Sequence, residues 1–136
     1  MRSRRAGIGL VVVALALTGC ASMGLAPSET GVWELEADPS PSSTSIEVGV
    51  SRLECASGVT GELSEPRVTA EDDRIVITTP VADNGSDDGE CPGNDVVPLT
   101  VDLGEPIGER TLVDGACLST EAADTELCAD AVRWRP

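Results

Sequence analysis

This chain of 136 residues contains no phenylalanine and no tyrosine, so any hydrophobic core has to be built mainly from aliphatic side chains. Its only large aromatic side chains are those of two tryptophans, Trp33 and Trp134. From Thr44 to Pro136 the large apolar residues are 11 Val, 4 Ile, 7 Leu and Trp134. Most of these are β-branched, which favours strands over helices. The composition therefore predicts an all-β domain with a thin core that needs covalent support.

Alternating apolar and polar residues mark the first expected strand of this domain. Ile46, Val48 and Val50 would lie on one face of a pleated strand. Leu53 resumes the alternation one residue out of step, which indicates a β-bulge near Ser51-Arg52.

Further short strands are expected at 74–79, 99–103 and 111–113. The last of them ends at Asp114-Gly115, a dipeptide typical of tight turns. The segment 119–131 is compatible with a helix and could equally be a loop. Turn residues between the strands suit a small antiparallel sandwich or open barrel, which is the fold we expect.

Four cysteines, Cys55, Cys91, Cys117 and Cys128, follow Cys20 in the sequence. If the domain is exported, as the N-terminal segment described below predicts, an even number of cysteines predicts two disulfides, with three possible pairings. We favour Cys55–Cys91 with Cys117–Cys128, because the second pair closes a short loop and the first then clamps a long acidic one. A four-cysteine metal site is the competing hypothesis, but the paired C-x₂-C spacing is absent.

The charge of the chain is strongly one-sided. It has 24 acidic residues and nine basic ones, all arginines, for a formal net charge of −15. The absence of histidine and lysine excludes a Ser-His-Asp triad, an imidazole metal ligand, a Schiff-base enzyme and a P-loop. The acidity argues against nucleic-acid binding. We expect no cofactor and no enzymatic activity, and a hydrolase acting through carboxylates alone remains the alternative.

The N-terminus has the features of an export and lipidation signal. Three arginines among the first five residues precede the uncharged segment 6–17. As a helix, that segment would span about 18 Å, too short for a bilayer core of about 30 Å. It leads into Leu17-Thr18-Gly19-Cys20, which resembles the bacterial lipobox. The resemblance implies that residues 1–19 are cleaved and that Cys20 carries the lipid. An ordinary secretory signal or an uncleaved anchor is the alternative.

Residues 20–43 are expected to form the lipidated N-terminus and a proline- and serine-rich tether. Pro27, Pro39 and Pro41 disfavour helix and extend the chain. Within this stretch Val32–Leu35 alternates, so a short strand docked on the domain is a second possibility. We expect the domain proper to span 44–136.

The acidic, glycine-rich segment 82–95 is long for a loop in a small domain. We expect a solvated connection, and calcium binding is the alternative. Against the calcium-loop pattern D-x-[DN]-x-[DN]-G-x₅-E, the corresponding residues are Asn84, Ser86, Asp88, Gly89 and Asp95.

Trp134 is expected to close the core from a last strand, and a partner contact is the alternative. Four arginines are expected to act mostly as counter-charges on the acidic surface; they are Arg52, Arg67, Arg74 and Arg110.

Several segments of residues 46–136 resemble a family of exported actinobacterial proteins that has no established activity. They are Arg52–Cys55, Cys91–Asn94, Leu103–Gly115 and Val132–Trp134. The resemblance implies a small secreted domain with disulfides.

Taken together, the sequence predicts a lipoprotein on the extracytoplasmic face of the cell membrane. Its membrane contact would be the lipid on Cys20, and its acidic domain would be a binding or structural module of the cell envelope with an unidentified protein partner. A cation-binding protein that uses segment 82–95 is the first alternative, and the carboxylate hydrolase is the second.

Overall fold

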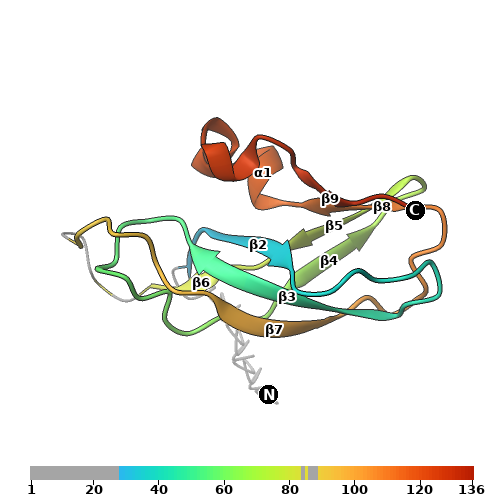
Figure 1. The fold of residues 1–136 in the computed structure, drawn as a ribbon, viewed down its shortest axis with the longest axis horizontal. Helices are drawn as coiled ribbons and strands as arrows, with labels where there is room; N and C mark the ends of the chain where they lie inside the picture. The colour runs from blue at the N-terminus through green and yellow to red at the C-terminus, as the bar shows by residue number, and fades with distance from the viewer. Residues whose placement is uncertain (1–27, 84, 86–88) are drawn as a thin grey trace, which may run out of the picture.

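Two β-sheets face each other across a hydrophobic core in the computed structural model, which describes residues 28–83, 85 and 89–136 (Figure 1). The first sheet has the strand order β2-β3-β7, with bounds Gly31–Leu35, Ser45–Arg52 and Val97–Asp102. The second has the order β4-β5-β8-β9, with bounds Arg67–Ala70, Arg74–Thr78, Thr111–Asp114 and Val132–Trp134. A two-stranded pair joins β1 (Ser28–Glu29) to β6 (Val81–Ala82).

The predicted fold class is confirmed: the described residues form antiparallel sheets that do not close into a barrel, with two disulfides. One pair of neighbouring strands departs from the antiparallel rule. Strands β5 and β8 run parallel, with Ile75 opposite Leu112. Between them the chain crosses to the first sheet, forms β7 there and returns, and this long connection is what a parallel pair requires.

The core lies between the inner faces of the two sheets. Ile46, Val48 and Val50 of β3 are buried against Ile75 and Ile77 of β5, as the alternation predicts. Trp134 packs against this cluster from β9 while remaining partly exposed, so its expected place at the core is confirmed. The largest fully buried side chain is an unexpected one, Trp33 of β2.

The position of Trp33 corrects the expected domain boundary. Residues 20–43 were predicted as a tether, with a docked strand at Val32–Leu35 as the second possibility. The second possibility is confirmed, because β2 pairs antiparallel with β3 and Trp33 lies opposite Val50 with 1% of its surface exposed. Its indole Nε1 donates to the carbonyl of Ile77 at 3.0 Å, across the core. Burial of a tryptophan and a strand ladder outweigh the proline-rich composition, so the domain includes residues that precede Thr44.

The expected bulge near Ser51 is absent from the β2–β3 pairing, whose register runs without a shift from Leu35↔Val48 to Gly31↔Arg52. The inward position after Val50 is taken by Arg52, which is 3% exposed. Arg52 was expected on the acidic surface, and that prediction is wrong. The alternation continues unbroken, with a cation in the place of an aliphatic residue.

The turn expected at Asp114-Gly115 is present at Gly115, and it leads into a short helix rather than into another strand. Strand β8 ends at Asp114 and leads into α1 (Ala116–Ser119), which is followed by the 3-10 turns η1 (Glu121–Asp124) and η2 (Glu126–Cys128). We call the segment 115–131 the helical cap; Figure 1 shows it above the start of β2. Val32 of β2 is buried beneath it with Ala116 and Ala122.

Both preferred disulfides are confirmed. Cys55 pairs with Cys91 at a Cα separation of 4.6 Å, and Cys117 pairs with Cys128 at 5.3 Å. The first joins the segment after β3 to the segment before β7, and the second closes the helical cap on itself.

Candidate functional site

A hollow on the outer face of the first sheet is the most promising place for a ligand in the described part of the chain. Its floor consists of two neighbouring cross-strand pairs, Val32↔Ser51 and Glu34↔Gly49, whose side chains point away from the core. Its walls are Val96, which precedes β7, and Leu127, which belongs to η2. The hollow has a volume of about 230 Å³. It is mostly apolar in its lining, as ligand sites commonly are.

A second hollow, of about 320 Å³, adjoins the first, because Ser51 and Leu127 line both. Its far end is lined by the Cys55–Cys91 disulfide and by Asn94. We call the two hollows together the outer groove. One wall of the groove carries one disulfide, and the other wall is the turn that the second disulfide holds.

Both walls present large apolar side chains to solvent. Val96 is 61% exposed and Leu127 is 50% exposed. Val96 lies directly over Gly49: a Cβ on that glycine would meet the Val96 Cγ1 at 2.5 Å. The Glu36 Oε1 lies 3.4 Å from the same point. A methyl group and a carboxylate therefore converge over one glycine, at one end of the groove.

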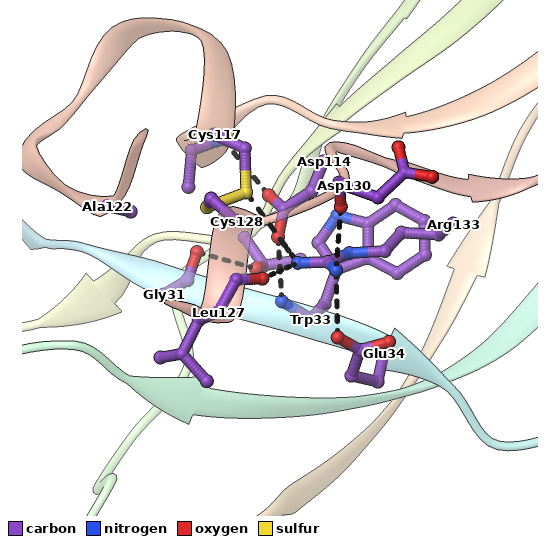
Figure 2. Close-up of polar contacts among 12 residues, drawn as sticks. Gly31, Trp33, Glu34, Asp114, Cys117, Ala122, Leu127, Cys128, Asp130 and Arg133 are labelled. Atoms are coloured by element: carbon purple, nitrogen blue, oxygen red, sulfur yellow. Dashed lines mark hydrogen bonds and ion pairs between the residues drawn. A yellow bond between two sulfur atoms is a disulfide. The ribbon is translucent and has the colours of Figure 1, made fainter. Parts of the chain in front are cut away.

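Arg133 holds the Leu127 wall in place through a hydrogen bond to the Leu127 carbonyl (Figure 2). Its Nη2 donates to the Leu127 carbonyl at 3.0 Å and to the Asp114 Oδ2 at 3.1 Å. Its Nη1 forms an ion pair with the Glu34 Oε1 at 2.8 Å and also donates to the Asp130 carbonyl. One guanidinium thus connects β9, β8, the helical cap and the floor of the groove.

Asp114 is the buried counterpart of Arg133, with no exposed surface. Its Oδ2 accepts from the Trp33 N–H at 3.0 Å, on the edge of β2 that faces away from β3, and its Oδ1 accepts from the Ala116 N–H at 3.0 Å. Burial raises the pKa of Asp114 above its ordinary value, and the hydrogen bonds from Trp33, Arg133 and Ala116 oppose that rise. Because Asp114 is fully enclosed, its role in this arrangement is to join strand to cap rather than to meet a substrate.

A second buried cation, Arg52, holds the opposite side of the groove. Its Nε donates to the Thr60 carbonyl at 3.0 Å, its Nη2 donates to the Ala82 carbonyl at 2.6 Å, and its Nη1 forms an ion pair with Glu29. Asn94 completes the wall, because its Nδ2 donates to the Arg52 carbonyl at 3.0 Å and to the Glu54 carbonyl at 2.7 Å.

Only some of the residues of the calcium hypothesis are among those that the structure describes. Asn84, Ser86 and Asp88 lie outside the described residues. Asp95 is committed to the loop itself, since its Oδ1 accepts from the Thr60 N–H at 2.6 Å and its carbonyl accepts from the Thr60 hydroxyl. Among the described residues, no group of three or more His, Cys, Asp or Glu side chains is placed to hold a metal ion.

The arginines show how charge is distributed. Ion pairs on the surface bind Arg74 to Glu71 and Arg110 to Glu105, so these two are counter-charges as predicted. Arg52 and Arg133 instead pair beneath the surface. Sequence reasoning placed Arg52 on the surface, and it did not predict the burial of Arg133 or the role of Asp114; the signal available for Arg52 was its inward phase in the alternation of β3.

Comparison with family models, curated proteins and solved structures finds no significant match to this chain. The resemblances noted in the sequence therefore stay predictions. Cys20 and the segment 1–19 lie outside the described residues. Within the described ranges, no helix is both long enough and apolar enough to cross a membrane.

Proposed function

We propose that this chain is a lipid-anchored protein of the extracytoplasmic membrane face, whose β-domain is a non-enzymatic binding module that takes a polypeptide partner in the outer groove. The observation that carries the proposal is the groove itself: an open, apolar hollow whose two walls are fastened by disulfides and buried arginines. Fastening of this kind suits a preformed binding surface, because a rigid site loses less conformational entropy when it binds.

Two features support the location. The sequence Leu17-Thr18-Gly19-Cys20 resembles a lipobox, and two disulfides join cysteines of the described domain. Structural disulfides persist outside the reducing cytosol. From Cys20 onward the chain has six arginines and 24 acidic residues. Such a polypeptide is repelled by anionic lipid headgroups, so attachment would depend on the lipid, with two acyl chains giving stable anchoring.

Fractionation of cells tests the anchor. The native chain should sediment with membranes, and mass spectrometry should find an acylated peptide that begins at Cys20. A Cys20→Ser variant should lose the acyl groups. An unmodified Cys20 in a membrane-free, secreted protein would refute the anchor.

Site-specific photo-crosslinking in intact native cells tests the binding role. A benzoylphenylalanine in place of Ser51 lies in the groove, and the same residue in place of the exposed Glu65 serves as the control. We expect discrete adducts from position 51 that are absent from position 65 and are lost when Leu127→Ser is added. Identical patterns from both positions, or none from either, would refute the binding role and leave the anchor standing.

A further inference from the structure

The geometry points to a specific class of occupant: we infer that the outer groove binds an extended, cationic peptide segment that carries an aliphatic side chain next to arginine or lysine. The inference rests on the proposed function, because it states what chemistry the partner of that binding module has. It comes from the combination of an apolar slot with an acidic rim on one sheet face.

The slot is built for a single apolar side chain. Ser51 on its floor has little side-chain bulk, while Val96 covers Gly49 on one side and Leu127 rises on the other. Each of these walls is half exposed or more, although both are aliphatic. An aliphatic side chain placed between them removes apolar surface of both walls from water, which is the main favourable term in such binding.

The rim selects for positive charge. Glu36 lies over Gly49 at the edge of the slot, and it forms no ion pair with any described residue. Glu34, whose side chain is 71% exposed, is next to it on the same face and is only partly neutralised by Arg133. A basic residue adjacent to the inserted aliphatic side chain would meet these two carboxylates.

The charge of the whole chain excludes the other simple occupants of the slot. From Cys20 onward, a second copy would bring another 24 acidic residues against six arginines, and five of those arginines already have partners in their own copy. An anionic lipid surface is repelled for the same reason. A basic segment of another protein is attracted over the distance of a Debye length before it reaches the slot.

The free edge of the first sheet at β7 is a weaker place for an extended peptide. Strand β7 pairs with β3 on one side only, but Pro98 lies within it, and proline blocks the ladder that an added strand would need. The occupant is therefore expected to lie across the outer face, held by side chains.

The test uses the full-length protein, purified from membranes in mild detergent, and three synthetic peptides. The probe is acetyl-Ala-Arg-Leu-Arg-Ala-amide, and the two comparison peptides replace both arginines with glutamate or the leucine with alanine. Isothermal titration calorimetry should show the probe binding at least about tenfold more tightly than the glutamate peptide at low salt, with the ratio falling sharply at about 0.5 M salt. The alanine peptide should bind about five- to tenfold more weakly than the probe.

Paired variants place the binding in the groove. Leu127→Ser should weaken binding of the probe about fivefold. Leu118→Ser changes a similarly exposed leucine of the same helical cap and should leave the affinity for the probe unchanged. Glu36→Gln should weaken it about two- to fivefold, and Glu65→Gln should not. The altered side chains are exposed, so thermal unfolding should confirm that each variant folds like the native chain.

Equal binding of the probe and the glutamate peptide, or equal losses in the groove and control variants, would overturn the inference. If crosslinking from position 51 still captured a partner in cells, the binding module would stand and its preference for a cationic occupant would be wrong. Self-association of the protein that depends on Leu127 would point to a second copy as the occupant and would also overturn the inference.

Discussion

Replacement of Arg133 by methionine is the sharpest test of how the site is held together. Methionine keeps an unbranched apolar stem but removes every hydrogen bond and the positive charge. The Arg133 side chain is 7% exposed and that of Asp114 is fully buried, so the substitution leaves a buried carboxylate without its cation. Breaking a buried pair by removing one partner costs about 3–5 kcal/mol of unfolding free energy. In a domain of this size that lowers the melting temperature by at least about 10 °C.

Arg135→Met is the matched control. Arg135 lies two residues further along the chain and pairs with Asp130, but both side chains are more than half exposed, at 60% and 58%. An exposed pair contributes little because water and salt screen it. The two substitutions are chemically identical, so any difference between them reports the buried contacts of Arg133 alone.

The pH dependence gives a second, independent readout. Asp114 has a pKa that burial raises, and loss of Arg133 raises it further. An acid with a raised folded-state pKa binds its proton more tightly when folded. Protonation of Asp114 therefore stabilises the folded state. That contribution to the unfolding free energy is fully present below the pKa of Asp114 in the unfolded state, and it is lost as the pH rises through the pKa of Asp114 in the folded state. The deficit of Arg133→Met should accordingly shrink between about pH 7 and about pH 4.5, because protonation removes the buried charge.

Urea unfolding of a soluble chain from 21 to 136, with disulfides intact and followed by tryptophan fluorescence, measures these quantities. Trp33 is fully buried and donates to the second sheet, so its emission should report the loss of the core. The reasoning is refuted if Arg133→Met is no more destabilising than Arg135→Met, or if its deficit is the same at both pH values.

The second disulfide and the calcium hypothesis each give a further prediction. Replacing both Cys117 and Cys128 by alanine should lower the unfolding free energy by about 3 kcal/mol, because the disulfide closes a loop with a sequence separation of 11. The same urea titration measures this change. A loss below about 1 kcal/mol would show that Arg133 alone fixes the helical cap. The melting temperature in millimolar Ca²⁺ should equal that in EDTA, because an oxygen of the Asp95 carboxylate already accepts from the Thr60 N–H. A calcium site filled to about 100 times its dissociation constant would instead add about 2.7 kcal/mol to the unfolding free energy and raise the melting temperature clearly.

The strands and the disulfides could be predicted because they depend on local patterns in the sequence. The alternation of Ile46, Val48 and Val50 is a property of consecutive residues, and it predicts the buried face of β3 correctly. The disulfides follow from cysteine number and loop length, and both pairings are confirmed. These features need no knowledge of what lies opposite them in space.

The site could not be predicted in the same way, because its residues acquire their roles from distant segments. Trp33 was assigned to a tether by its proline-rich surroundings, and only the edge of β3 and the Ile77 carbonyl make it a core residue. Arg52 is tolerable inside the domain because carbonyls at Thr60 and Ala82 receive its donors. The local alternation indicates an inward side chain at each of the two positions, but it does not show which distant carbonyls would accept their donors.

The same contacts connect the stability of the fold to the chemistry of its surface. Of the six arginines that follow Cys20, Arg52 and Arg133 are placed beneath the surface, where each holds one side of the outer groove. Their charges are therefore directed largely to internal carbonyls and carboxylates, and the outer face around Glu34 and Glu36 stays acidic. Because Arg133 pairs with Glu34 and also holds the Leu127 wall, Arg133→Met should affect peptide binding in two opposing directions. The freed Glu34 should strengthen attraction of a cationic probe at low salt, while the loosened Leu127 wall should weaken binding at high salt, where only the apolar contact remains. A salt-independent effect of the substitution would show that the two roles of Arg133 are not separable in this manner.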